Sequence, residues 1–362
     1  MFDIHMLPAA HGDCIFIEYG PTSQRRQLLI DGGVAGTYDK LRPRLLSIPE
    51  QRRKLELLVV THVDADHIEG IVKMLTDETL SFSVQDIWFN AYPQLAAGLP
   101  LDFGGTQGEY LSALIQKRKL PWNRASDGGA IVVPAKGKLP TFDLAGGLVL
   151  TLLSPNLPKM HKMADAWEDE VRKAGLDPNN PKKALEHLEK KGKRLIAHFA
   201  EDDGPDVEAL VAEEFTGDTS PANGSSIAFL AEYEKKRILF AADAHSDVLE
   251  ESIGRLLAER KLDVLELDAF KLPHHGSSAN LSPALLERIA AKRFLISSNG
   301  DRFEHPDPEA IARMVCRKKP CTLVFNYRSE ENRIWDDPRS KKQYGYATEY
   351  PATNDDGIQL TI

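Results

Sequence analysis

Two histidines and two aspartates lie within six consecutive positions, at His62, Asp64, Asp66 and His67. Imidazole nitrogens and carboxylate oxygens are the groups with which proteins hold divalent metal ions. The alternative is a polar turn, in which Asp66 caps a helix and His62 merely ends a strand. Four ligand-type side chains with no lysine or arginine among them favour the metal site.

The flanking residues place this cluster between a strand and a helix. Residues 57–60 are apolar and partly β-branched, which predicts a buried strand. The apolar spacing over residues 68–75 predicts a helix. Because the backbone between them is irregular, neighbouring side chains can converge there on one point.

Two later segments carry residues of the same kind. Asp243 ends the apolar stretch 237–243, and His274 and His275 lie in Lys-Leu-Pro-His-His-Gly-Ser at 271–277. Together with the H-x-D-x-D-H stretch, they resemble the motifs of the metallo-β-lactamase fold. They are most similar to the soluble hydrolase domain of ComEC-type DNA-uptake channels and its free-standing relatives. The resemblance covers most of residues 1–90 and 223–310.

The chain also shows two similarly built halves. A hairpin over 14–31 ends at Asp31, and a helical stretch and a strand ending at His62 follow it. A second hairpin over 226–243 ends at Asp243, again before a helical stretch and a strand that ends at His274. This arrangement predicts an α/β fold, an αββα sandwich, with a site where the strand ends meet, and the resemblance implies that this is the metallo-β-lactamase sandwich.

We expect a helical insertion and a strand-rich C-terminal extension on this core. The expected parts are a first core half at 1–154, a charged helical insertion at 155–222, a second core half at 223–310 and an extension at 311–362. Helices are predicted at 164–174, 182–191 and 206–215. The insertion is a candidate for substrate selection or for homo-oligomer contact, with a merely solvated arm as the alternative. Strands at 322–327 and 357–362 are expected to extend the second sheet.

The resemblance implies a binuclear metal centre. His62 and Asp64 would hold one ion, the next two motif residues the second, and Asp243 would bridge. One histidine of the pair His274 and His275 would complete the set. We prefer His274 because it directly follows the strand, but the alternation of side chains along the strand does not decide between the two. The expected metal ligands are therefore His62, Asp64, Asp66, His67, Asp243 and His274.

Other residues are assigned catalytic or supporting roles by the same resemblance. The catalytic candidates are Asp66, which could also orient a water molecule, His275 and His305. The substrate-contacting or supporting candidates are Asp31, Asn223, Ser277 and Asn299. A turn-capping role is the alternative for Asp31, and His11-Gly12-Asp13 is interpreted as a turn.

Two departures from the relatives concern the metal centre, the first its choice of metal and the second how firmly one of the ions is held. Asp64 stands where many of them carry histidine, and residues 221–226 lack the third histidine that many place on the first ion. An acidic half-site favours harder ions. We expect two divalent ions, zinc first, with manganese or iron as alternatives.

Paired ions at such a site activate water and stabilise the charge that develops during hydrolysis. The expected function is therefore a metal-dependent hydrolase of phosphodiesters, a nuclease or phosphodiesterase acting on nucleic acid or a nucleotide. The alternatives are a small-ester hydrolase resembling phosphorylcholine esterases or lactonases, a diiron redox protein, and a non-catalytic binding module.

Composition and charge limit the partners and the cellular location that we expect. A net charge of −9 argues against a surface that clamps nucleic acid broadly. Three cysteines cannot form a disulfide framework. With no apolar run of about 18 residues and no signal-peptide pattern, we expect a cytoplasmic protein without a membrane partner.

Overall fold

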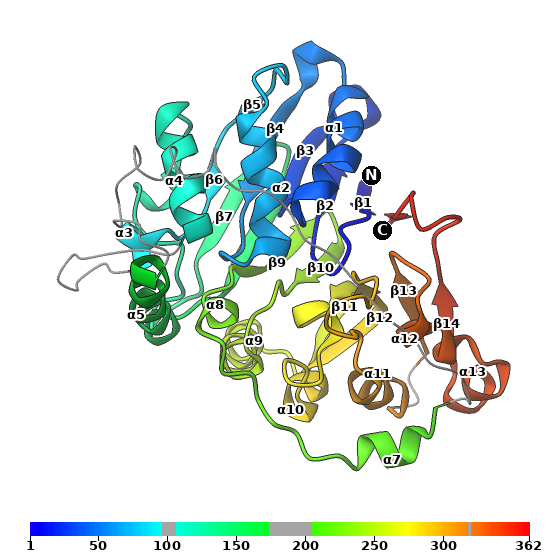
Figure 1. The fold of residues 1–362 in the computed structure, drawn as a ribbon. Helices are drawn as coiled ribbons and strands as arrows, with labels where there is room; N and C mark the ends of the chain where they lie inside the picture. The colour runs from blue at the N-terminus through cyan, green and yellow to red at the C-terminus, as the bar shows by residue number, and fades with distance from the viewer. Residues whose placement is uncertain (96–105, 174–204, 318–319) are drawn as a thin grey trace.

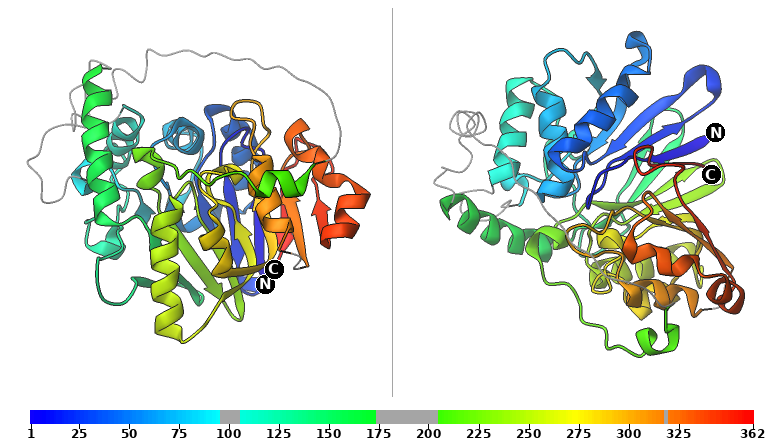
Figure 2. Two further views of the ribbon diagram at one scale, coloured as in Figure 1. Left: turned by 90° about the horizontal axis from the view of Figure 1, so that it is seen from below. Right: turned by 45° about the vertical axis from the view of Figure 1, so that its right-hand side comes forward.

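The computed structural model describes residues 1–95, 106–173, 205–317 and 320–362. These residues form two β-sheets that pack face to face, with helices on both outer sides (Figure 1). Figure 2 shows the same layers from two further directions. The αββα sandwich expected from the two similar halves is confirmed.

The first sheet has the strand order β15-β1-β2-β3-β4-β5, and β6 also pairs with β4. The β2–β3 pair is the expected hairpin, and β4 runs parallel to β3. The C-terminal strand β15 pairs antiparallel with β1, so the expectation that it extends the second sheet is wrong. The reason is that β1, which was not predicted, leaves a free edge beside the C-terminus. The strands are β1 Phe2–Met6, β2 Ile15–Tyr19, β3 Arg26–Ile30, β4 Lys54–Val59, β5 Ser83–Val84, β6 Ile87–Trp88 and β15 Ile358–Thr361.

The second sheet has the strand order β14-β13-β12-β11-β10-β9-β8-β7. Strands β10 to β14 are parallel, so their carboxyl ends lie along one edge. The expected hairpin is β9–β10, and β13 joins this sheet as predicted. The strands are β7 Thr141–Leu144, β8 Leu148–Ser154, β9 Ala228–Tyr233, β10 Lys236–Phe240, β11 Leu265–Lys271, β12 Ile289–Ile296, β13 Cys321–Phe325 and β14 Tyr346–Glu349.

Two apolar clusters hold the layers together. One fills the space between the sheets and extends under α9, α10 and α11 of the second sheet. The other lies between the first sheet and α1, α2, α4 and α5. The helices are α1 Tyr38–Leu46, α2 Ala65–Thr76, α3 Tyr92–Leu95, α4 Thr106–Lys117, α5 Leu157–Lys173, α7 Val207–Val211, α8 Pro221–Gly224, α9 Ser246–Arg260, α10 Pro283–Glu287, α11 Pro308–Val315, α12 Glu330–Arg333 and α13 Pro338–Tyr344.

Helix α2 approaches the end of β3 closely because two glycines face each other. A Cβ atom on Gly70 would lie 1.9 Å from the carbonyl oxygen of Gly32, a distance that no side chain can occupy. The amide of Gly32 donates to the carbonyl of His67 (2.8 Å). This contact brings the first turn of α2 against the end of β3.

The part of the chain expected to form an insertion is described only at its two ends. Helix α5 begins before the predicted 164–174, and Met160 and Trp167 on it are buried against the first sheet's helices. The predicted helix at 182–191 lies outside the described residues. Helix α7 lies near α11 (Figure 1). The guanidinium of Arg313 on α11 lies 5.6 Å from the ring of Phe215, which follows α7 in the chain. Within the described ranges, no helix is long and apolar enough to cross a membrane.

Candidate metal centre

The strand ends of both sheets bring ligand-type side chains together. His62 follows β4, His67 lies in the first turn of α2, and Asp243 and His275 follow β10 and β11. The Nε2 atom of His67 lies 3.4 Å from the Oδ2 atom of Asp243 and 3.3 Å from Nε2 of His275. Among the described residues, four groups of atoms could hold an ion; the two that do not include Asp13 are His62–His67–Asp243 and Asp66–His67–His275.

Hydrogen bonds fix the orientation of two of these imidazoles. The Nδ1 atom of His67 donates to Oδ2 of Asp31 (2.8 Å), and Nδ1 of His275 donates to the carbonyl of Ser297 (2.9 Å). A carboxylate and a carbonyl can only accept, so each neutral ring carries its proton on Nδ1. The Nε2 lone pairs of both rings therefore face the centre.

His62 is oriented in the same way. Thr61 donates its hydroxyl proton to Asp31 (2.7 Å), so its oxygen accepts from Nδ1 of His62 at 3.0 Å. The Nε2 atom of His62 is buried without a hydrogen-bond partner, 3.6 Å from Asp64 and 3.8 Å from Asp243. Asp31 thus supports two histidines at once, which goes beyond a turn cap.

These atoms fit a cation. Two lone pairs 3.3 Å apart, on His67 and His275, repel each other unless a proton or a metal ion lies between them. Buried polar atoms normally have partners, yet Nε2 of His62 and Oδ1 of Asp243 have none. Nitrogen and carboxylate donors that point at one buried place are a donor set for zinc or a neighbouring divalent ion.

Electrostatics reinforce this fit. Burial lowers the pKa of His67, but the carboxylates of Asp243 and Asp31 outweigh it and raise that pKa well above its usual value. Burial likewise opposes charge on Asp243, but His67, His275 and His274 hold its pKa well below the usual range. The carboxylates thus attract positive charge to the place where the imidazoles meet.

The geometry departs from the expected choice within the histidine pair. His275 is buried, with Nε2 3.7 Å from Asp66 and 3.6 Å from Asp243. His274 belongs to neither of the two groups above; its Nε2 lies 3.9 Å from Asp243, and its side chain is 24% exposed. Its Nδ1 faces Oδ1 of Asn280 at 2.9 Å. His274 therefore borders the centre from the open side.

Backbone strain is concentrated around the centre. The φ angles of Asp31, Ala242, His274 and His275 are 57°, 48°, 45° and 56°, in the left-handed region that costs energy for side chains other than glycine. Such strain persists only where the surroundings impose it, and it gathers at functional sites.

A buried ion pair beside the centre was not predicted. Nζ of Lys271 donates to Oδ2 of Asp13 at 2.6 Å, and both side chains are almost fully buried. The other oxygen of Asp13 lies 3.6 Å from Nδ1 of His275. Asp13 belongs to the other two groups that could hold an ion, and Lys271 occupies only its Oδ2 atom. The turn at 11–13 therefore joins the two sheets.

The remaining candidate site residues lie around the metal centre. Asn223 donates to Asp218 at 2.7 Å and lies 3.4 Å from Nδ1 of His274. His305 contacts Asp307 (2.6 Å), and its ring centroid lies 5.1 Å from that of His274. The hydroxyl of Ser277 faces Asp307, and the side-chain amide of Asn299 donates a hydrogen bond to Asp301. The side chain of Asp64 is 43% exposed beside His62.

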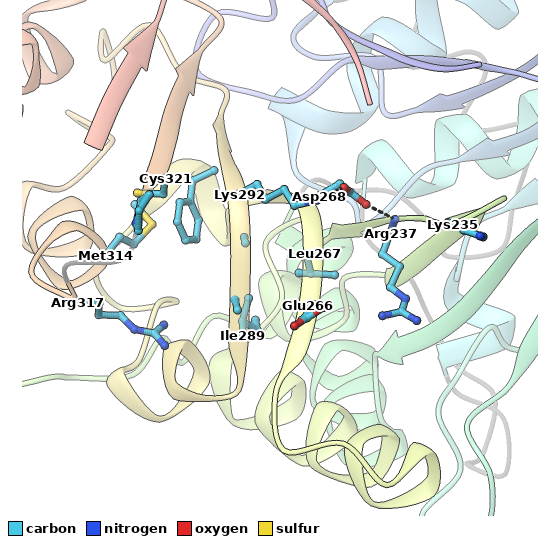
Figure 3. Close-up of a pocket in the computed structure, with 14 residues that line it drawn as sticks. Lys235, Arg237, Glu266, Leu267, Asp268, Ile289, Lys292, Met314, Arg317 and Cys321 are labelled. Atoms are coloured by element: carbon cyan, nitrogen blue, oxygen red, sulfur yellow. Dashed lines mark hydrogen bonds and ion pairs between the residues drawn. The ribbon is translucent and has the colours of Figure 1, made fainter. Parts of the chain in front are cut away.

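A cleft of about 480 Å³ lies away from these residues. It is lined by Lys235, Arg237, Glu266, Asp268 and Lys292, among others (Figure 3). None of the candidate metal ligands lines it. Lys292 lies in the first half of β12, whereas the candidate centre lies beyond the carboxyl ends of the strands. Because these residues lie away from the candidate metal centre, substitutions in the cleft can serve as controls.

The chain matches no family model and no curated protein. Its structure is similar to three solved structures. Zinc-bound PqqB from Methylobacterium extorquens is 12% identical, with 96% of this chain and 87% of that chain covered and a TM-score of 0.39. The metallo-β-lactamase-fold protein YhfI from Bacillus subtilis is 10% identical, with 99% and 98% covered and a TM-score of 0.40.

The third is the short form of human tRNase Z, which is 11% identical, with 99% of each chain covered and a TM-score of 0.40. The two packed sheets of this chain themselves show the αββα arrangement.

Proposed function

We propose that this protein is a metal-dependent hydrolase whose substrates are phosphodiesters. One observation carries the proposal: the Nε2 lone pairs of His62, His67 and His275 and the carboxylate of Asp243 meet at one buried place. Two of these buried atoms, Nε2 of His62 and Oδ1 of Asp243, have no hydrogen-bond partner, although buried polar atoms normally have one.

The proposed ligands fall into two sets. His62, Asp64 and Asp243 would hold one ion, and Asp66, His67 and His275 the other. His275 replaces His274 in this assignment because only His275 lies within reach of Asp66 and His67. Zinc fits the three imidazoles, and the exposed carboxylate of Asp64 leaves manganese or iron as alternatives.

Two bound divalent ions would supply Lewis acidity and lower the pKa of a water molecule. The protein's own residues would position and move protons. Asp66, buried beside His275, would orient the attacking water through its free carboxylate oxygen. His274, whose Nε2 faces the centre from the open side, would exchange a proton with the substrate.

A phosphodiester is favoured over a carboxylic ester by the side chains around the opening. His274 and His305 lie in ring contact there, and Arg302 lies nearby at the surface. Imidazole and guanidinium groups match the charged oxygens of a phosphodiester. The motif resemblance to ComEC-type hydrolase domains supports the same class, with a nuclease or phosphodiesterase activity.

The experiment compares substrates on one metal-loaded preparation. Chelated protein would be reloaded with zinc, manganese or iron and assayed on a nitrophenyl phosphodiester, an oligonucleotide and a carboxylic ester. We expect cleavage of the two diesters that chelation abolishes and reloading restores. His67→Ala should abolish it, and Lys292→Ala, in the remote cleft, should not. Cleavage of the carboxylic ester alone would refute the proposal.

A further inference from the structure

An exposed aromatic ring stands at the opening of the candidate centre. Phe303 is 45% exposed and is the one aromatic residue among the large apolar side chains that the described chain exposes. It lies on the loop that follows β12, and the backbone of this loop bonds to the turn before β2 through Asn299 and Ala10 (3.0 Å). A single exposed apolar side chain is ordinary on a protein surface, so the groups around Phe303 decide what it can bind.

Two basic groups accompany the ring. The guanidinium of Arg302 lies 4.9 Å from the ring centroid of Phe303, and the His11 ring meets Phe303 edge-to-face at 5.6 Å. Arg302 lies 3.4 Å from Nε2 of His11. Among the described residues, Arg302 forms no ion pair with a carboxylate. Its charge is therefore available to an anionic ligand.

Ring contacts connect this group to the centre. Phe303 lies 6.1 Å from His305, and His305 lies 5.1 Å from His274, measured between ring centroids. Nε2 of His274 lies 3.9 Å from Asp243. The exposed ring is thus only two ring contacts away from the histidine that borders the centre, close enough for one substrate molecule to touch both.

The chemistry of this group selects among ligands. A flat ring beside a guanidinium suits a substrate with an aromatic face and a negative charge. A quaternary ammonium group would also contact an aromatic ring, but Arg302 would repel it. An unpaired nucleobase next to a phosphodiester meets both requirements.

We propose that His11, Arg302 and Phe303 form a base subsite, in which Phe303 stacks on a nucleobase adjacent to the scissile phosphodiester and Arg302 contacts its phosphate oxygens. This inference rests on the proposed phosphodiesterase function. It names the part of the substrate that the centre itself does not touch.

The test uses two dinucleotides of equal charge. One is a thymidine dinucleotide, and the other carries abasic tetrahydrofuran residues in place of both nucleosides. Stacking on an aromatic side chain changes affinity by about tenfold per base. Phe303→Ala should therefore raise KM about tenfold for the first dinucleotide, leave kcat within about twofold, and leave the abasic substrate unchanged.

Matched variants complete the design. Phe303→Tyr keeps a ring and should restore the wild-type KM, whereas Arg302→Ala should raise KM for both dinucleotides. Lys292→Ala removes a positive charge in the remote cleft and should change neither. Equal effects of Phe303→Ala on both dinucleotides, or no effect on either, would overturn the base subsite.

A binding measurement separates this inference from the proposed function. Thymidine 5′-monophosphate would be titrated into the metal-loaded wild-type protein and into Phe303→Ala, with binding followed by calorimetry. If neither dinucleotide is cleaved, the phosphodiesterase proposal fails, and weaker nucleotide binding by Phe303→Ala would still support the subsite. If both are cleaved and both proteins bind the nucleotide equally, the subsite fails alone.

Discussion

The Nε2 atoms of His67 and His275 lie 3.3 Å apart although 208 positions separate the two residues in the chain. His67 lies in the helix that follows β4 of the first sheet, and His275 follows β11, a central strand of the second sheet. This distance requires both sheets to be assembled. Metal binding should consequently be coupled to folding.

Asp31→Asn should lower the affinity of the protein for its metal ions. Asp31 accepts from Nδ1 of His67 and from the Thr61 hydroxyl that supports His62. Losing such a supporting carboxylate costs about 10- to 100-fold in metal affinity. Competition with a chromogenic chelator measures this change. Asp39→Asn, at an exposed position of α1, is the control, and equal affinities in the two variants would contradict the role of Asp31.

The two neighbouring histidines should behave differently when each is replaced by alanine. His275→Ala should lower the metal content by about one ion per chain, because its Nε2 faces the shared centre. His274→Ala should keep the metal and lower kcat. Atomic absorption and turnover on a nitrophenyl phosphodiester would measure both effects. Metal loss from His274→Ala alone would reverse the assignment.

The buried pair of Lys271 and Asp13 should show strong coupling. Removing one partner leaves an uncompensated buried charge, which costs about 3–5 kcal/mol. Lys271→Met and Asp13→Asn should each lower the free energy of unfolding by this order, and the double variant by less than the sum. Urea unfolding of the metal-free protein measures all three. Additive losses would show that the pair does not act as a unit.

The stability of the metal-free protein should fall as pH rises. Burial lowers the pKa values of His62 and His67, but the facing carboxylates raise both pKa values above the ordinary value of about 6.5. Their protonation in the folded state therefore contributes stability that is complete below about pH 6.5 and is lost as pH rises through the raised pKa values. Thermal unfolding of chelated protein between pH 6 and pH 9 should show this decline. The difference in melting temperature between the metal-loaded and the chelated protein should grow over the same pH range. A difference that shrinks as pH rises would contradict this prediction.

The sequence predicted those features that reside in one segment. The His62–His67 cluster, the strand before it and the helix after it all lie within a few residues of one another, and the strands ending near Asp31 and Asp243 have clear apolar patterns. Long-range partners leave no such signal. Lys271 and Asp13 are 258 positions apart, and nothing in the spacing of either residue indicates the other.

The choice between His274 and His275 shows a second limit. Alternation along a strand would direct these side chains to opposite sides, but both residues have left-handed φ angles of 45° and 56°, so strand phase ends at Lys271. The placement of β15 is a third case. Its alternating pattern predicts a strand, whereas the sheet it joins depends on which edge is free after β1 has formed.

Anomalous diffraction from crystals grown with zinc, recorded above and below the zinc absorption edge, tests the central claim most directly. We expect a peak between His67 and His275, about 2.0–2.1 Å from both Nε2 atoms, with a second peak beside His62 and Asp243 at sufficient zinc. His67→Ala crystals should lack the first peak. A map with no peak among these residues in the wild-type protein would contradict the metal centre.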